Sequence, residues 1–188
     1  MPLNSIDTIK QDLHADDEAV RNARANPENF RLLYEKYYRQ IFLFVLHRVG
    51  EKETTADITS QVFLNAFVNL EKFRFKGLPF SSWLYRISIN ECNSFFKKNK
   101  KERQVILNNS LAEELYEEMF NEDMLDELKL ILPTILEKLK PNDFQFIELR
   151  YLEGMSFREM AEILDITESH ARVKTYRSLE KLRKLFLK

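Results

Sequence analysis

Apolar side chains recur three and four residues apart along most of the chain, which is the spacing of one face of an α-helix. The first such stretch follows Asn26-Pro27, where Asn suits a helix cap and Pro suits the first helical position, and it ends at Gly50. A second helix is expected from near Thr55 to Leu70, because Gly and Pro within residues 73–79 prevent its continuation.

A third helix is expected to begin at the Ser81-Ser82 caps and to end among four lysines between residues 97 and 101, cations that suit a helix C-terminus. Its apolar stripe includes Trp83 and Ile87, so we expect the Trp83 ring to pack in the core rather than to stack on a ligand. Three helices of this length make one compact domain, which we assign to residues 1–104.

Residues 105–127 are polar and acidic, and we interpret them as a linker. Leu111, Leu115 and Met119 are spaced four apart, so part of this segment can be helical. The amphipathic pattern returns in residues 128–188, the second predicted domain. Its helices are expected over Met124–Leu139, from Pro141, over Phe157–Leu164, and from a Thr167 cap to the neighbourhood of Phe186. We therefore predict an all-α protein made of two small helical domains joined by an acidic linker.

The composition agrees with a helical protein and excludes several other classes. With 188 residues, 44% of them hydrophobic, the chain is too apolar for disorder, and three glycines are too few for the turns of an all-β sandwich or a doubly wound sheet. The single Cys92 cannot support a disulfide scaffold, and neither a secretory leader nor an apolar run of about 18 residues is recognisable. We expect a cytoplasmic protein without membrane insertion.

The net charge of −1 conceals a division along the chain. Residues 28–104 carry a net charge of +6, residues 105–127 carry −8, and residues 128–188 carry +3. Basic segments attract nucleic acid because contact with phosphates releases condensed counterions, whereas an acidic block repels it. The alternative is that these charges only solvate helix faces.

The sequence from Ser156 to Thr167 has the order of a helix-turn-helix: a cap, a short helix, a three-residue turn and a new cap. The helix that follows is strongly basic, with seven cations and two acidic residues between positions 167 and 188. The N-terminal half of such a helix reaches bases in a major groove, while its flanking cations reach phosphates. The alternative is a helical hairpin with a solvated basic face. We predict that the second domain is a DNA-binding helix-turn-helix.

Three stretches of the chain resemble bacterial sigma factors. Leu149–Leu164 resembles the promoter-reading helix-turn-helix of this family, Ala56–Phe63 resembles its polymerase-binding helix, and Phe80–Glu91 resembles its promoter-melting helix. The likeness covers residues 28–104 and 128–188. The short connection between them resembles the extracytoplasmic-function (ECF) group, which lacks the middle domain of larger sigma factors.

The resemblance implies a protein that directs core RNA polymerase to specific promoters and helps to melt them, without enzymatic activity or a cofactor. Its expected partners are the clamp and flap surfaces of core polymerase, promoter DNA and, as is common in the family, an anti-sigma factor, and the free protein is expected to be a monomer. The nearest alternative is a stand-alone helix-turn-helix regulator that binds duplex DNA without polymerase. A more distant one is a helical adaptor, whose affinity would lack the steep salt dependence of phosphate contacts.

The resemblance also implies a polymerase contact on the second helix. Asp57 and Gln61 lie four residues apart, so both can face the clamp coiled coil from one side of the helix. For Asp57 the alternative is an anion that interacts with the dipole at the helix N-terminus.

The pocket for a base flipped from the minus-ten promoter element is implied at the loop of residues 73–79 and the start of the next helix. Stacking of an extruded base on an aromatic ring stabilises by about 1–3 kcal/mol, and a nearby cation adds phosphate affinity. Asn90 can bond a base edge, and its alternative is a solvated helix residue. The residues assigned to this site are Phe73, Phe75, Lys76, Phe80 and Asn90.

Reading of the minus-thirty-five element is implied for the second helix of the helix-turn-helix. The residues assigned to it are Arg172, Val173, Lys174, Tyr176 and Arg177. An Arg side chain can bond guanine bidentately, Lys174 is expected at a phosphate, and Tyr176 can touch a thymine methyl group. Packing in the core is the alternative for Val173 and Tyr176.

The sequence gives no support to a catalytic or metal site. His14, His47 and His170 are scattered without the spacing of metal ligands, Cys92 has no partner motif nearby, and no glycine-rich phosphate loop occurs. We therefore expect neither a metal nor a catalytic residue.

Overall fold

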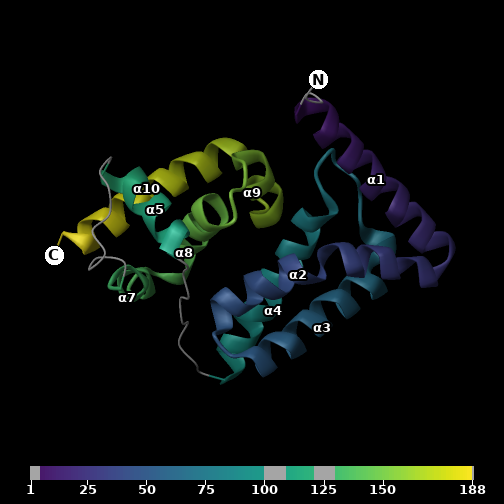
Figure 1. The fold of residues 1–188 in the computed structure, drawn as a ribbon, viewed down its shortest axis with the longest axis horizontal. Helices are drawn as coiled ribbons and strands as arrows, with labels where there is room; N and C mark the ends of the chain where they lie inside the picture. The colour runs from purple at the N-terminus through teal and green to yellow at the C-terminus, as the bar shows by residue number, and fades with distance from the viewer. Residues whose placement is uncertain (1–4, 100–108, 121–129, 188) are drawn as a thin grey trace. The chain divides into compact units, whose positions relative to one another are not determined.

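The computed structural model describes residues 5–99, 109–120 and 130–187. Within these ranges every regular element is helical and none is a strand, which confirms the all-α prediction (Figure 1). The chain folds into two compact units. Of the described residues, the first unit comprises 5–45 and 51–99, and the second comprises 46–50, 109–120 and 130–187.

The chain as far as residue 99 forms the three predicted helices and one more. Its elements are α1 (Ser5–Ala25), the 3₁₀ turn η1 (Pro27–Asn29), α2 (Phe30–Val49), α3 (Lys52–Val68), the 3₁₀ turn η2 (Leu70–Lys72) and α4 (Phe80–Asn99). As predicted, Asn26 is a helix cap: its side chain accepts a 3.1 Å hydrogen bond from the Glu28 N–H at the start of η1, which leads into α2. Gly50 ends α2 with a φ of 79°, a conformation that favours glycine.

The sequence pattern does not predict α1, which packs against η2 and α4. The buried positions of this helix include Asp16, Val20 and Ala23. In the sequence, Val20 and Ala23 continue at helical spacing from Ile6, Ile9 and Leu13, but the polar Asp16 interrupts this apolar stripe. The stripe is therefore weaker than the one that marks each of the other helices.

The predicted cap of α4 at Ser81-Ser82 is wrong. The helix begins at Phe80, whose N–H donates a 2.8 Å hydrogen bond to the Asp16 carboxylate of α1, and Ser82 is buried. An orphan N–H at a helix start needs an acceptor, which is usually the side chain just before the helix. Here the acceptor lies 64 residues earlier in the chain, so the local sequence could not reveal it.

Three aromatic rings close the loop before α4. The ring centroid of Trp83 lies 5.3 Å from that of Phe73 and 5.5 Å from that of Phe80, and the Phe73 and Phe80 rings meet edge to face at 5.2 Å. Aromatic pairs at such distances stabilise by about 0.5–1.5 kcal/mol beyond the area they bury. These contacts bear out the packing expected of Trp83, although its side chain is only partly buried and also lines a pocket.

The second unit contains several short helices and one long one. Its described elements are α5 (Asn109–Phe120), α7 (Leu132–Glu137), α8 (Pro141–Ile147), the π-helical turn η3 (Glu148–Leu152), α9 (Phe157–Leu164) and α10 (Glu168–Phe186). α8, α9 and α10 begin where the sequence predicts. The helix expected over Met124–Leu139 differs, because residues 124–129 lie outside the described ranges and the described helix covers only Leu132–Glu137.

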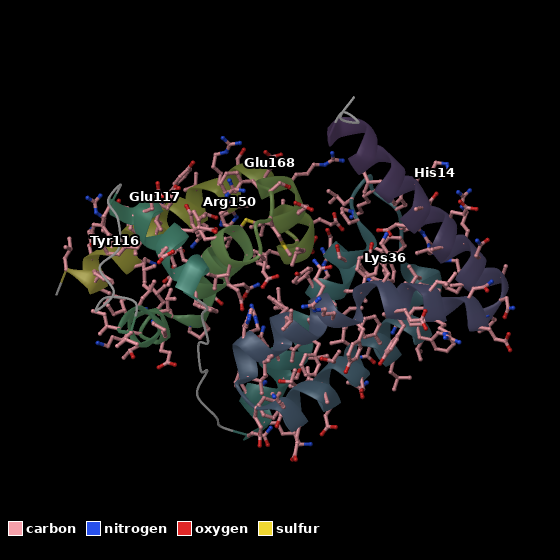
Figure 2. The ribbon with its side chains drawn as sticks, viewed as in Figure 1. His14, Lys36, Tyr116, Glu117, Arg150 and Glu168 are labelled. Carbon is pink, nitrogen blue, oxygen red and sulfur yellow. The ribbon has the colours of Figure 1, made fainter. Side chains whose placement is uncertain are left out.

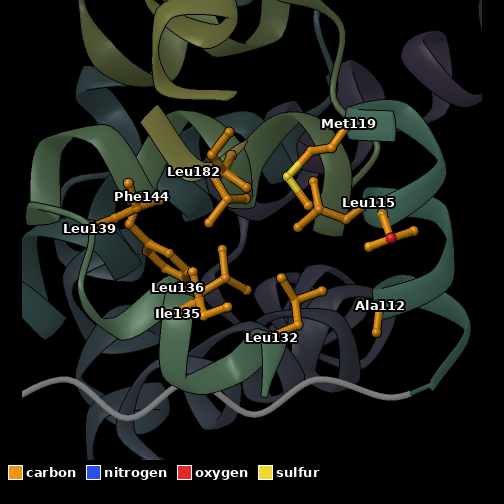
Figure 3. Packing of buried hydrophobic residues seen from close by; sticks show 11 residues of the cluster. Ala112, Leu115, Met119, Leu132, Ile135, Leu136, Leu139, Phe144 and Leu182 are labelled. Carbon is orange, nitrogen blue, oxygen red and sulfur yellow. The ribbon is translucent and has the colours of Figure 1, made fainter. Parts of the chain in front are cut away.

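The segment interpreted as a linker contains α5, and this helix is part of the core of the second unit. Figure 3 shows Leu115 and Met119 pointing from α5 toward Leu182 of α10. One buried cluster unites α5, α7, α8 and α10; its members are Ala112, Leu115, Tyr116, Met119, Leu132, Ile135, Leu136, Leu139, Phe144, Ile147 and Leu182. Residues 109–120 are therefore a folded helix rather than a linker. The apolar spacing of four residues, rather than the acidic composition, indicates the structure of this segment, because the acidic side chains lie on the exposed face of the helix.

A polar contact also joins α5 to η3. The Tyr151 hydroxyl donates to the Glu118 carboxylate over 3.4 Å. Burial raises the pKa of Tyr151, and the negative charge of Glu118 raises it further. The hydroxyl therefore remains protonated at neutral pH and keeps its donor role.

Candidate nucleic-acid interface

Local caps build the helix-turn-helix of the second unit. The Ser156 hydroxyl accepts from the Glu159 N–H at 3.2 Å, and the Glu159 carboxylate accepts from the Ser156 N–H at 2.8 Å, which forms a capping box at the start of α9. α9 ends at Asp165, whose φ of 56° turns the chain toward α10. Thr167 then caps α10 by accepting from the His170 N–H at 3.2 Å. The predicted order of cap, helix, turn and cap is confirmed.

The outward face of α10 carries all five residues assigned to the minus-thirty-five element. Val173 is 47% exposed and Tyr176 is 52% exposed, so the alternative of core packing is wrong for both. Arg172, Lys174 and Arg177 are exposed as well. The inner face of the helix packs through Ala171, Thr175, Ser178 and Leu182. A basic and aromatic face on the second helix of a helix-turn-helix is the kind of surface that enters a major groove.

Phe157, at the first position of α9, organises this face although the sequence does not single it out. The guanidinium groups of Arg150 and Arg172 each lie 5.0 Å from its ring centroid, and the Tyr176 ring lies 6.1 Å away. Arg172 also pairs with Glu168 at 3.5 Å (Arg150 and Glu168 are labelled in Figure 2). These contacts restrain the Arg172 side chain, which lowers the conformational entropy that it would lose on binding a ligand. Phe157 has the spacing of a core residue, so no sequence signal marks this role.

Asp57 and Gln61 are exposed on one face of α3. Gln61 donates to the Asn65 side chain at 3.0 Å, and Asn65 donates to the Glu91 carboxylate of α4 at 2.8 Å, so a row of polar side chains continues onto α4. Asp57 is the sixth residue of α3. Because the influence of the helix dipole falls off within the first turn, where Glu53 lies, the alternative role of Asp57 as a dipole-stabilised anion has little support.

The loop between η2 and α4 divides its aromatic residues between core and surface. Phe73 and Phe80 are buried against each other and against Trp83, so neither ring has a free face for a base. This burial contradicts the assignment of Phe73 and Phe80 to base stacking; the loop uses these rings to close the core. Phe75 is 39% exposed and Lys76 is exposed, so both side chains are accessible to a ligand.

An open pocket of about 430 Å³ lies where α3, η2 and α4 meet. It is lined by Asn65, Asn69, Lys72, Trp83, Arg86, Ile87, Asn90 and Glu91. Asn90, which is expected to bond a base edge, thus lies beside two further amides, two cations and an indole ring. Amides bond base edges, cations bond phosphates and aromatic rings stack on bases. The spacing of side chains along single helices could not reveal this pocket, because its lining comes from three elements.

Other kinds of site find no support in the part of the chain that the structure describes. There, no group of three His, Cys, Asp or Glu side chains is arranged to hold a metal ion. None of the described helices combines the length and the apolar character needed to cross a bilayer. Cys92 is buried and belongs to no disulfide.

Two protein families match this chain, one in each half. Residues 33–102 match the family described as Sigma-70 region 2, and residues 129–182 match the family described as Sigma-70, region 4. The chain is also 28% identical over 170 residues to the ECF RNA polymerase sigma factor BldN of Streptomyces coelicolor. The chain belongs to the ECF family of RNA polymerase sigma factors.

This sigma factor matches its relatives over different shares of their lengths. The match with BldN spans 89% of this chain and 64% of BldN, so the chain covers less than two thirds of that relative. The ECF sigma factor SigM of Bacillus subtilis is 21% identical over 155 residues, which are 82% of this chain and 93% of SigM. The ECF sigma-E factor of Escherichia coli K12 is 26% identical over 170 residues, which are 85% of this chain and 87% of that protein.

Two solved structures share the fold of this sigma factor. One is the structure of CnrH in complex with the cytosolic domain of CnrY. The matched chain is 19% identical in sequence to this one, the match covers 91% of this chain and 96% of the other, and the TM-score is 0.62. The sigma factor RpoE of Bartonella quintana, solved in complex with the anti-sigma factor NepR, is 17% identical, covers 84% and 96% of the two chains, and has a TM-score of 0.60. The resemblance noted from the sequence is confirmed.

Proposed function

We propose that this sigma factor directs core RNA polymerase to specific promoters and helps to melt them at the start of transcription. It acts by binding, without a catalytic step or a cofactor, and it acts in the bacterial cytoplasm, where polymerase and promoters are found. The observation that carries this function is the presence of sigma region 2 and sigma region 4 on one chain, in that order. A stand-alone helix-turn-helix regulator needs only the second of these.

We assign the minus-thirty-five element to the outward face of α10. Arg172 and Arg177 are exposed donors that can bond guanine bidentately, and Lys174 is a point charge suited to a phosphate. Val173 and Tyr176 add apolar surface for a thymine methyl group or a sugar. Because Phe157 restrains Arg172, this side chain loses less conformational entropy when it enters the major groove.

We assign the minus-ten element to the exposed loop residues and to the pocket where α3, η2 and α4 meet. Phe75 offers an accessible ring and Lys76 an accessible cation, while Asn90 offers an amide within the pocket. An unpaired base needs a stacking partner, an edge partner and a nearby positive charge. The pocket and the loop together provide all three, although Phe73 and Phe80 are occupied in the core.

We assign contact with core polymerase to the exposed row of Asp57 and Gln61 on α3. Both side chains are exposed, so both are accessible to a partner protein. The flap of the polymerase is the expected partner of the second domain. An anti-sigma factor is a further proposed partner, by analogy with RpoE, whose structure contains the anti-sigma factor NepR.

The alternative of a stand-alone regulator is tested by footprinting of promoter DNA with and without core polymerase. A sigma factor is expected to protect both promoter elements only when core polymerase is present, and bases near the minus-ten element should become reactive as the duplex opens. Equal protection in the absence of polymerase, with no opening in its presence, would favour the regulator.

Reversal of the charge at Asp57 is expected to weaken binding to core polymerase while the fold stays intact. Asp57→Lys should cost at least about 1.5 kcal/mol of binding free energy, the lower end for close charge pairs across an interface. Titration of labelled core polymerase measures this loss. Glu28→Lys, which makes the same reversal at another exposed position, is the matched control. Equal affinities of the two variants would remove the Asp57 face from the interface.

Arg177 and Lys174 are expected to contribute in different ways. Arg177→Ala should cost about 1–3 kcal/mol and relax the preference at one position of the minus-thirty-five element. Lys174→Ala should weaken binding to all sequences alike and reduce the dependence of affinity on salt. Binding of the polymerase complex to single-base promoter variants separates the two effects. If both variants lost the same affinity for every promoter, Arg177 would be a phosphate contact as well.

A further inference from the structure

The N-terminal helix α1 contacts both ends of the loop that precedes α4. At the first end, Arg24 of α1 donates to the carbonyl oxygen of Leu70, at 2.9 Å from Nη2 and 3.3 Å from Nε. The same Nη2 donates to the carbonyl oxygen of Phe73 at 2.5 Å. One guanidinium group thus fixes the position at which the chain leaves η2, because hydrogen bonds from a charged donor are about twice as strong as neutral ones.

At the other end of the loop, Asp16 of α1 holds the start of α4. Asp16 is 2% exposed, and its carboxylate accepts from the Phe80 N–H at 2.8 Å, from Lys36 at 2.6 Å and from the Tyr37 hydroxyl at 2.6 Å. Lys36 and Tyr37 belong to α2, and Lys36 is labelled in Figure 2. A buried carboxylate with three donors is fully satisfied, and its charge is also favourable at the N-terminus of α4.

Two of the residues between these anchors, Phe75 and Lys76, are assigned to promoter DNA. The chain from Arg74 to Pro79 spans the interval and carries the exposed Phe75 and Lys76. Neither Asp16 nor Arg24 belongs to the minus-ten surface itself. Residues 33–102, which match sigma region 2, do not include α1, so the two anchors lie outside the matched part of the domain.

We infer that Asp16 and Arg24 are positioning residues through which α1 fixes the loop that presents Phe75 and Lys76 to the minus-ten element. This inference rests on the proposed function of the loop. A loop fixed at both ends loses less conformational entropy when it binds an unpaired base, so more of the contact energy appears as promoter opening. Removal of one anchor leaves Phe75 and Lys76 in place in the sequence, but it lowers the population of the loop conformation that can bind an unpaired base.

The experiment compares wild type with Arg24→Ala, in the full chain, by two measurements. The first is acrylamide quenching of Trp83, the single tryptophan of the chain, which packs on Phe73 and Phe80 and so reports the state of the loop ends. The second is the fraction of open complex formed with core polymerase, followed by the reactivity of unpaired bases. Far-UV circular dichroism and the affinity for core polymerase establish that the fold and the polymerase contact are retained.

Arg21→Ala is the matched control, because Arg21 is an exposed arginine on the same helix that pairs with Asp17 at 3.3 Å. Arg24→Lys tests rescue, since lysine keeps the charge but cannot donate as a fork to two carbonyl groups. Asp16→Asn tests the second anchor, since the amide oxygen can still accept from the Phe80 N–H while the charge is lost.

Arg24→Ala should raise the quenching of Trp83 and lower open-complex formation about tenfold, the loss expected for a charged hydrogen-bonding group. Arg21→Ala should match wild type, whereas Arg24→Lys and Asp16→Asn should fall between. Unchanged quenching in Arg24→Ala, or unchanged opening despite raised quenching, would overturn the inference. Wild-type protein that opens no promoter would instead contradict the proposed function, and the quenching contrast, which needs neither polymerase nor DNA, would still decide whether α1 holds the loop.

Discussion

Replacement of Phe80 by alanine is expected to destabilise the first unit by about 3–5 kcal/mol, as for other fully buried phenylalanines. The ring is completely buried among Phe73, Trp83 and Tyr37, and its removal leaves a cavity that a helix start cannot close easily. Denaturant unfolding followed by the fluorescence of Trp83 measures this loss, because the reporter lies beside the cavity.

Phe75→Ala is the matched control, because it removes the same ring from the exposed part of the loop. Its stability should change by no more than about 0.5 kcal/mol, as is usual at the surface. Promoter opening should instead weaken by about 1–3 kcal/mol, the contribution of one stacked base. A stable Phe80→Ala variant with a specific defect in opening would restore Phe80 to the base-stacking role that its burial contradicts.

Replacement of Leu115 by alanine is expected to destabilise the second unit by about 2–5 kcal/mol. Leu115 is fully buried in the cluster that joins α5 to α7, α8 and α10, so its truncation leaves a cavity in that core. The loss should appear in the far-UV circular dichroism transition. The fluorescence transition of Trp83, which lies in the first unit, should move little.

Leu130→Ala is the control for Leu115→Ala, because the same truncation is made at a leucine that is 82% exposed. It should leave the transition within about 0.5 kcal/mol of wild type. If the two variants unfolded at the same denaturant concentration, α5 would contribute little to the core and the interpretation of residues 105–127 as a linker would be restored.

The helix-turn-helix was predictable from sequence because its determinants are local. Ser156 and Thr167 each cap a helix that begins at the next residue, and the outward cations of α10 repeat with the helical period. A capping side chain bonds within three residues, so sequence spacing is enough to place it. The same holds for the Asn26 cap and for Gly50 at the end of α2.

The parts that escaped prediction depend on contacts between elements distant in sequence. Asp16 caps α4 from another helix, and no pattern around Phe80 shows this partner. The loop aromatics have similar flanking residues, yet Phe73 is buried and Phe75 is exposed, because only one of them meets the rings of α4. Composition was misleading for α5, where the charged residues lie on one face and the apolar residues on the other.

The central claim, that this protein confers promoter recognition on core polymerase, is tested most directly by transcription of a randomised promoter library. Core RNA polymerase is supplied with and without the protein, and the RNA 5′ ends are sequenced. We predict discrete start sites only when the protein is present, on templates that share one element near minus ten and another near minus thirty-five. Arg177→Ala should relax the second element alone. Start sites that are the same with and without the protein would contradict the account.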